Sequence, residues 1–222
     1  MRISIFGLGY VGAVCAGCLS ARGHQVIGVD VSQDKIDMIN QGKSPIVEPG
    51  LAALLDQGVG NGLLRGTTNV SEAVADSELS FIAVGTPSKR NGDLDLAYME
   101  SVCMQIGVAL RDKADRHTVV IRSTVLPGTV KNVVIPLLET ASGKKAGVDF
   151  GVATNPEFLR ESTAIKDYDF PAMTVIGELD EQSGELLQAL YSELDAPIIR
   201  KSIEVAEMIK YTCNVWHATK VS

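Results

Sequence analysis

The stretch "ISIFGLGYVGAVCAGCLSARGHQVIGVDV", residues 3–31, contains three closely spaced glycines, Gly7, Gly9 and Gly12, and has Asp30 near its end. The apolar run before the glycines predicts a buried strand, and the small residues after them predict a closely packed helix. The second apolar run predicts another strand with Asp30 at its tip. Because the pattern G-x-G-x-x-G alone is weak evidence of a ligand site, the rest of the chain has to decide its meaning.

The remainder of the chain has the composition of a soluble globular protein. It has 222 residues, of which 45% are hydrophobic and 21% charged, enough for a sizeable core. The net charge of −7 and the pI near 5.0 argue against a nucleic-acid-binding surface, which needs a basic footprint. Neither a membrane-spanning apolar run nor a secretory signal peptide is found in the sequence. We therefore expect a cytoplasmic protein with no nucleic-acid or membrane partner.

The four cysteines are Cys15, Cys18, Cys103 and Cys213. The spacing of Cys15 and Cys18 could indicate half of a metal site, but no matching pair or histidine lies near them in the sequence. Their position in the predicted small-residue helix favours buried thiols instead. We expect no metal site, and no disulfides in a cytosolic chain of this size.

Predicted strands and helices alternate along the whole chain. The predicted strands are 2–6, 25–31, 79–84, 118–122, 173–177 and 198–199, and residues 150–153 lead into a further loop. The predicted helices are 11–21, 32–40, 49–58, 94–111, 128–140, 181–194 and a last one from about 203. This alternation predicts an α/β fold of the Rossmann type, a doubly wound and mostly parallel sheet with helices on both faces.

In such a sheet, the loops after the strands form the binding crevice. Gly7 then permits a tight turn, Gly9 lets the backbone approach a pyrophosphate, and Gly12 lets the helix pack against the strand. The free amides and the positive end of that helix receive the phosphates. Asp30 can accept hydrogen bonds from both ribose hydroxyls and repels the extra phosphate of NADP, so the expected cofactor is NAD. A turn that binds no ligand is the less favoured alternative. FAD, which binds to the same kind of turn, is the stronger alternative to NAD.

The last predicted helix places Lys210, Asn214 and His217 on one stripe, which combines a cation, an amide and an imidazole. An ordinary solvated face is the default interpretation of such a stripe. Cys213 lies beside the stripe and is interpreted as packing. An apolar face of the same helix could contain Val205, Ile209, Thr212 and Trp216.

The same helix has no terminating glycine, proline or polar tail, so we expect it to be cut in mid-course within a longer protein. The expected organisation is a dinucleotide-binding domain at 1–200, followed at 201–222 by the start of a long linking helix.

Four motifs, "GLGYVG" at 7–12, "VGTPSKRNGDLDL" at 84–96, "STVLPGT" at 123–129 and "NPEFLRE" at 155–161, occur in this order. Together they resemble the UDP-glucose/GDP-mannose dehydrogenase family over the whole chain. The resemblance implies oxidation of the C6 alcohol of a nucleotide sugar to a carboxylate with two NAD per turnover.

The segment that begins with the last motif is more similar to family members that act on GDP-mannose. Members that act on UDP-glucose commonly have glycine where this chain has Ser162. The implied product is GDP-mannuronate, a precursor of an acidic exopolysaccharide such as alginate. A member that acts on UDP-glucose, and an NAD-binding module without catalytic activity, remain the alternatives.

The resemblance also implies roles for single residues of the cofactor site. Tyr10 and Val11 belong at the pyrophosphate turn together with the glycines, Asp30 on the ribose and Lys35 beside the adenosine end. The nicotinamide half is expected to lie along Thr86 and Thr124, of which Thr124 is also a candidate catalytic residue. Without the resemblance, Lys35 is a solvated charge and the threonines cap the turns that follow them.

The resemblance implies that Glu161 contacts substrate and handles the water that releases the acid product. Lys210 and Asn214 are expected to contact the sugar and to stabilise charge on oxygen, and His217 to contact substrate. Glu157 and Glu161 are four residues apart and share a face if they lie on a helical turn, which favours a raised pKa for one of them. The alternative is that the two glutamates are an N-terminal capping pair that compensates the charge of Arg160.

The family's nucleophile is a cysteine in a G-G-x-C-x-P-K-D segment, which none of the four cysteines occupies. This thiolate traps the aldehyde so that a second hydride can leave. We therefore expect residues 1–222 to bind NAD and to turn over nothing alone. The resemblance also implies a homo-oligomer, a dimer or higher, formed through the long helix.

Overall fold

The computed structural model describes all residues from Met1 to Ser222 and contains one eight-stranded sheet. Its strands are β1 (Arg2–Phe6), β2 (Gln25–Val29), β3 (Leu64–Thr67), β4 (Leu79–Ile82), β5 (Thr118–Ile121), β6 (Gly151–Thr154), β7 (Thr174–Glu178) and β8 (Ile198–Ser202). The strand order is β3-β2-β1-β4-β5-β6-β7-β8, and all neighbours are parallel except β6 and β7. The chain runs outward from β1 in one direction and from β4 in the other. The expected doubly wound sheet is confirmed, with its topological switch point between β1 and β4.

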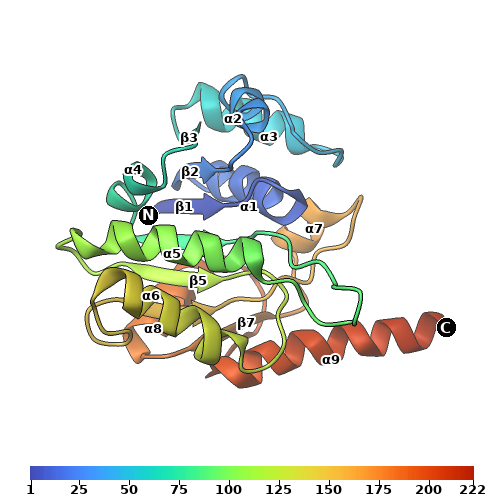
Figure 1. Ribbon diagram of the computed structural model, residues 1–222. Helices are drawn as coiled ribbons and strands as arrows, with labels where there is room; N and C mark the ends of the chain where they lie inside the picture. The colour runs from blue at the N-terminus through green and yellow to red at the C-terminus, as the bar shows by residue number, and fades with distance from the viewer.

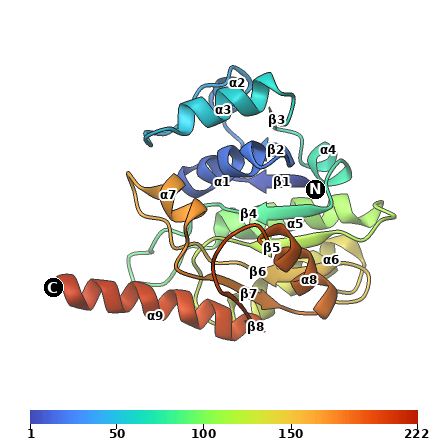
Figure 2. The same ribbon diagram turned by 180° about the vertical axis from the view of Figure 1, so that it is seen from behind.

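Helices cover both faces of the sheet (Figures 1 and 2). They are α1 (Tyr10–Ala21), α2 (Gln33–Asn40), α3 (Leu51–Gly60), α4 (Val70–Ala75), α5 (Ala97–Arg111), α6 (Ile135–Ser142), α7 (Ala164–Asp169), α8 (Glu181–Leu190) and α9 (Ile203–Val221). One hydrophobic core joins the sheet to α1, α3, α7 and α8. The other joins it to α4, α5 and the helix that ends as α6. Strands such as β4 and β5 are buried at every position, as their continuous apolar runs predict.

Three short elements were missing from the prediction, namely β3, α4 and α7. The strand β3 reads "LRGT" and lies at the edge of the sheet, so it needs no continuous apolar run. Both helices have only six residues, too few to show a helical period.

The single helix predicted at 128–140 is wrong in detail. Residues Val130–Val134 form a π-helical turn, η1, before α6 begins at Ile135. Pro136 lacks the N–H that would continue the α-helical ladder, which accounts for the wider turn before it.

The last helix, α9, starts directly after β8, and its second half extends beyond the body of the molecule (Figures 1 and 2). The buried residues of α9 are Ile203, Ala206, Glu207 and Lys210. The apolar face predicted from the sequence is mostly outside this contact, since Val205 is 45% exposed and Trp216 62%. Within 1–222, no helix is long and apolar enough to cross a membrane.

Candidate functional site

The turn after β1 has the geometry of a phosphate-binding turn. Gly7 has a φ of +96°, a left-handed conformation that L side chains rarely adopt. A Cβ on Gly12 would lie 1.8 Å from the carbonyl oxygen of Gly7, so this position excludes any larger residue. A Cβ on Gly9 would meet no atom within 4 Å, and no side chain caps the first turn of α1. The open space and the uncapped amides therefore fit a pyrophosphate at the start of α1.

Asp30 follows β2 and faces this turn. Its carboxylate accepts hydrogen bonds from the backbone N–H of Leu8 at 2.8 Å and of Ser32 at 3.0 Å. Lys35 Nζ lies 3.1 Å from the same carboxylate. Burial by itself raises the pKa of Asp30, but the two amides and Lys35 together hold it below its usual value. The structure thus places an ionised carboxylate and a lysine next to the glycine turn, where the sequence predicted the ribose.

The predicted nicotinamide residues come together from two neighbouring strands. Thr86 follows β4 and Thr124 follows β5, and the Thr86 hydroxyl donates to the Thr124 carbonyl oxygen at 2.8 Å. The Thr86 hydroxyl is therefore bonded to the neighbouring strand's loop and caps neither a helix nor the turn that follows it. Their side-chain roles toward a cofactor stay a prediction.

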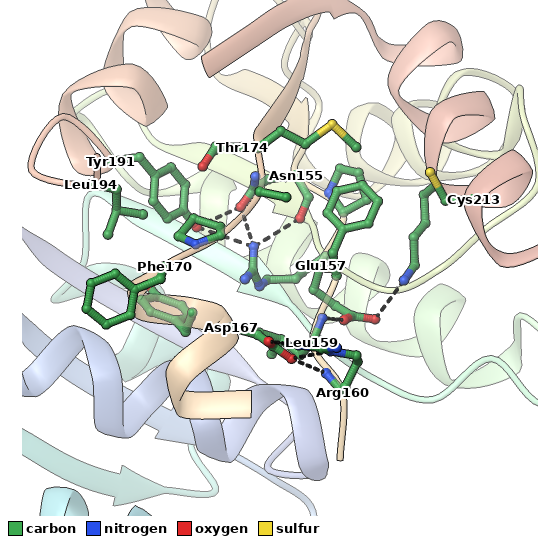
Figure 3. Close-up of a pocket in the computed structure, with 18 of the residues that line it drawn as sticks. Asn155, Glu157, Leu159, Arg160, Asp167, Phe170, Thr174, Tyr191, Leu194 and Cys213 are labelled. Atoms are coloured by element: carbon green, nitrogen blue, oxygen red, sulfur yellow. Dashed lines mark hydrogen bonds and ion pairs between the residues drawn. The ribbon is translucent and has the colours of Figure 1, made fainter. Parts of the chain in front are cut away.

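A pocket of about 510 Å³ opens on the carboxyl side of the sheet, between the segment after β6, α7 and α9 (Figure 3). Its polar side chains come from the segments after β5 and β6, from α7, from β7, from the end of α8 and from α9. The lining side chains that carry charge or hydrogen-bonding groups are Arg122, Asn155, Glu157, Arg160, Asp167, Tyr168, Thr174, Tyr191, Lys210, Asn214 and His217. The predicted stripe of Lys210, Asn214 and His217 therefore faces this pocket rather than bulk solvent alone.

Lys210 is the buried member of that stripe. Its Nζ lies 3.2 Å from Glu157 Oε1, and the two side chains are only 8% and 13% exposed. The ammonium also lies 5.2 Å from the centre of the Phe158 ring. The second oxygen of Glu157 accepts the N–H of Leu159 at 2.6 Å, which fixes the carboxylate in the pocket wall. The pair supplies a positioned cation and a positioned carboxylate on one side of the cavity.

Glu157 and Glu161 do not share a helical turn, because residues 155–160 form an irregular coil and α7 starts only at Ala164. Pro156 restrains the preceding residue to an extended backbone and so opposes a helix at this point. Glu157 points into the pocket, whereas Glu161 is exposed and not part of its lining. Arg160 pairs with Asp167 at 2.6 Å instead of with either glutamate, so the capping alternative is wrong too. The substrate role of Glu161 stays a prediction.

A buried arginine holds the start of this coil. Arg122 is 5% exposed, and its Nη1 donates to the carbonyl and side-chain oxygens of Asn155. The Tyr191 hydroxyl donates to the same side-chain oxygen at 2.7 Å, and the Asn155 amide donates to Val175 at 2.8 Å. Arg122 Nε contacts Cys15 Sγ at 3.1 Å. This network fixes the peptide two residues before Glu157.

All four cysteines are free, and Cys15, Cys18 and Cys103 are buried, which confirms the buried thiols predicted for Cys15 and Cys18. Cys213 differs from the prediction of a packing residue, because it is half-buried and lines the pocket next to Lys210 (Figure 3). No group of three or more His, Cys, Asp or Glu side chains is placed to hold a metal ion.

Sequence reasoning missed two residues of this site. Glu157 was seen only as a neighbour of Glu161, and Arg122 only as the last residue of the predicted strand 118–122. The spacing carries no sign that Glu157 reaches Lys210, because the pairing depends on the path of an irregular coil. Arg122 directly follows a fully buried strand, which is the one feature that could have indicated a buried charge.

A doubly wound sheet with an open glycine turn at its switch point and a polar pocket beside it is typical of a dinucleotide-binding domain. The family model of the UDP-glucose/GDP-mannose dehydrogenase family, NAD binding domain, matches residues 1–195. The chain belongs to this family, and those residues form its NAD-binding domain.

Two curated relatives illustrate the degree of similarity. The chain is 78% identical over all 222 residues to the GDP-mannose 6-dehydrogenase of Pseudomonas aeruginosa and covers 51% of that protein. It is 40% identical over 227 aligned positions to the UDP-glucose 6-dehydrogenase AglM of Haloferax volcanii, of which it covers 52%. The chain thus spans about half the length of the curated relatives it matches.

Solved structures agree with this assignment. A ternary complex of GDP-mannose dehydrogenase from Pseudomonas aeruginosa superimposes with a TM-score of 0.99 at 79% identity, over all of this chain and 51% of the other. A UDP-glucose dehydrogenase from Pyrobaculum islandicum gives a TM-score of 0.92 at 40% identity, over 96% of this chain and 49% of the other.

Proposed function

We propose that the full-length protein oxidises the C6 hydroxyl of GDP-mannose to the carboxylate of GDP-mannuronate, with two NAD as electron acceptors. In balance, the primary alcohol, two NAD⁺ and one water give the carboxylate, two NADH and three protons. The observation that carries the proposal is the buried Lys210–Glu157 pair in a pocket on the same edge of the sheet as the glycine turn. The relatives at 76–79% identity are named for GDP-mannose, and those near 40% for UDP-glucose, which supports the substrate.

The glycine turn, Asp30 and Lys35 would hold the adenosine and pyrophosphate parts of NAD. When bound, NAD supplies the hydride acceptor. The nicotinamide half of NAD would lie along Thr86 and Thr124, which a hydrogen bond joins. The same observations fit FAD less well, because the family model that matches is that of an NAD-binding domain.

In the pocket, Lys210 is placed to stabilise negative charge that develops on the substrate oxygen. Glu157 keeps the ammonium in place and offers a carboxylate to an exchangeable proton. Asn214 and His217 contribute an amide and an imidazole to the sugar side of the pocket. Glu161 reaches a substrate only outside this cavity, at its rim. The thiol that traps the aldehyde lies in a segment that these 222 residues do not contain.

The substrate is tested by following NADH production by the full-length protein with GDP-mannose and, separately, with UDP-glucose. We expect turnover with GDP-mannose at a much higher kcat/KM. Faster reduction of NAD with UDP-glucose would show that the protein is a UDP-glucose dehydrogenase of the same family instead. No NADH from any nucleotide sugar would favour a non-catalytic NAD-binding module.

Lys210→Met removes the pocket cation and keeps the apolar stem that packs on Phe158. Loss of one charge-stabilising group of this kind lowers turnover by about a hundredfold or more. Lys220→Met, on an exposed position of the same helix, serves as the matched control and should retain wild-type kinetics. Equal activity of both variants would remove Lys210 from the reaction.

The proposal includes two further expectations. A homo-oligomer formed through α9 is supported by the exposed apolar side chains of Val205, Met208 and Trp216, and sedimentation of the full-length protein tests it. A cytoplasmic location is supported by the four free thiols, which persist in reducing compartments. We keep the division into a domain at 1–200 and a linking helix from 201 as part of the same proposal.

A further inference from the structure

Glu48 is a buried carboxylate that no part of the proposed reaction uses. It lies in the loop between α2 and α3 and is 7% exposed. One oxygen accepts the backbone N–H of Ala164 at 2.9 Å, and the other accepts that of Ser162 at 2.8 Å. The Tyr10 hydroxyl also donates to it. A single side chain therefore joins the start of α1, the loop before α3 and the turn before α7.

The turn that Glu48 holds has a disfavoured backbone. Ser162 has a φ of +71° and is the only residue other than glycine with a positive φ in the structure. A residue with a Cβ adopts this left-handed conformation only where its surroundings impose it. The two amides that flank Thr163 are both bound to Glu48, which supplies that constraint.

A second carboxylate holds the other side of the same turn. Asp167 accepts hydrogen bonds from the backbone and the guanidinium of Arg160 and from the Thr163 hydroxyl. Residues 160–163 are thus fixed between Glu48 and Asp167. Glu161 is the exposed residue between these anchors, so they hold the backbone on both sides of it.

The contact with Tyr10 extends this arrangement to the dinucleotide turn. Tyr10 is the first residue of α1, directly after Gly9. Burial of the hydroxyl and the hydrogen bond to Glu48 raise the pKa of Tyr10 to about 12, so it remains a donor at neutral pH.

We propose that Glu48 is a positioning residue that holds the Arg160–Thr163 turn, and with it Glu161, in place for the nucleotide sugar, and ties this turn to Tyr10 at the dinucleotide turn. The inference rests on the proposed function, in which Glu161 meets the substrate at the rim of the pocket. Because the proposed function has Glu161 meet the substrate at the rim of the pocket, outside the cavity that holds Lys210, loss of Glu48 should weaken substrate binding more than chemistry.

Glu48→Gln tests this, because it replaces one of the two carboxylate oxygens by an NH₂ group. That group cannot accept the backbone N–H that the oxygen now binds. We expect the KM for GDP-mannose of the full-length protein to rise by about tenfold while kcat changes by less than about twofold. Glu185→Gln makes the same chemical change on an exposed position of α8 and should leave both parameters unchanged. An unchanged KM in Glu48→Gln would overturn the proposal.

Rescue by glycine separates positioning from a general loss of stability. Glycine adopts a φ near +70° without strain. Ser162→Gly in the Glu48→Gln background should therefore bring the raised KM most of the way back to the wild-type value. Ser162→Ala in that background keeps the Cβ and should recover none. Equal recovery by alanine and glycine, or none by either, would contradict the role of Glu48 in holding this backbone.

A measurement without turnover distinguishes failure of this inference from failure of the proposed function. Hydrogen exchange at the amides of Ser162 and Ala164 should become faster in Glu48→Gln, while exchange in β4 and β5 stays unchanged. This result supports the inference even if the wild-type protein oxidises no GDP-mannose, and unchanged exchange overturns it. If Glu48→Gln does not fold, Glu48→Asp, whose shorter side chain reaches only part of the turn, is measured with the same expectations.

Discussion

Gly9 and Gly12 belong to one motif but act differently, because one faces open space and the other faces backbone. We predict that Gly12→Ala lowers the free energy of unfolding by about 1–3 kcal/mol, since its Cβ would collide with the Gly7 carbonyl. Gly9→Ala should fold as the wild type does but bind NAD at least about tenfold more weakly, because its Cβ occupies the pyrophosphate position. Thermal melts and NAD titrations of both variants measure these effects.

Gly60→Ala is the control for this pair, because a Cβ there also meets no atom within 4 Å and the position is remote from the turn. It should leave NAD affinity unchanged and, because Gly60 is the last residue of α3, raise the free energy of unfolding by at most about 1 kcal/mol. Wild-type NAD affinity in Gly9→Ala would contradict the assignment of the turn.

Residue identities in the cofactor turn could be predicted, because each glycine has one steric task at a fixed offset from a strand. The Lys210–Glu157 pair could not, since it joins a helix and an irregular coil far apart in sequence. The backbone conformation of Ser162 could not be predicted either. The sequence marked it as a departure from glycine, but only the structure shows the left-handed φ that makes glycine suitable there.

At the scale of elements, α9 is fixed to the site by one buried carboxylate. Glu207 accepts the N–H of Gly128 at 2.6 Å and of Val130 at 2.9 Å, at the start of the helix that follows Thr124. Burial raises the pKa of Glu207, although both amides oppose this shift. One turn later on the same helix, Lys210 enters the pocket, so this contact sets the register of α9 against the loop after β5.

We predict that Glu207→Gln loosens the start of α9, because one of the two amides then faces an NH₂ group. Amide hydrogen exchange at 203–213 should become faster, with β1 and β4 unaffected. Glu204→Gln, on the neighbouring and more exposed side of α9, should change exchange there much less. Equal effects of the two substitutions would show that Glu207 does not fix α9.

The elements that were predicted correctly, such as β1, β4 and α1, have long apolar or small-residue patterns. The antiparallel pairing of β6 with β7 was not predictable, since a strand's apolar pattern does not encode its direction relative to a neighbour. The spacing of Glu157 and Glu161 could not show that 155–160 is a coil, because that spacing takes no account of Pro156.

At the scale of the whole molecule, the carboxyl ends and the amino ends of the strands carry different features. The glycine turn and the pocket lie at the carboxyl ends of the strands. A buried hydrogen-bond network around His117 lies at their amino ends. This histidine contacts Ser80 Oγ at 2.7 Å and the Ser77 carbonyl oxygen at 3.1 Å, and Ser4 joins the two serines. Burial and the nearby charge of Lys113 lower the pKa of His117 to about 3.

We predict a loss of stability in mild acid from this group. Between about pH 6.5 and pH 3 the unfolded chain binds a proton at His117 that the folded chain does not, so the free energy of unfolding falls as the pH falls. The slope reaches about 1.4 kcal/mol per pH unit. Urea denaturation between pH 7 and 5 should show a shallower slope for His117→Gln than for the wild type, and identical slopes would contradict the buried neutral imidazole.

The central claim is that the first turn of α1 and Asp30 hold an adenine dinucleotide without a 2′-phosphate. Equilibrium dialysis of the folded 222-residue chain against NAD and against NADP measures this most directly. We predict one NAD bound per chain and at least about tenfold weaker binding of NADP, because its extra phosphate meets an ionised carboxylate. No retention of NAD, or equal retention of both dinucleotides, would contradict the account.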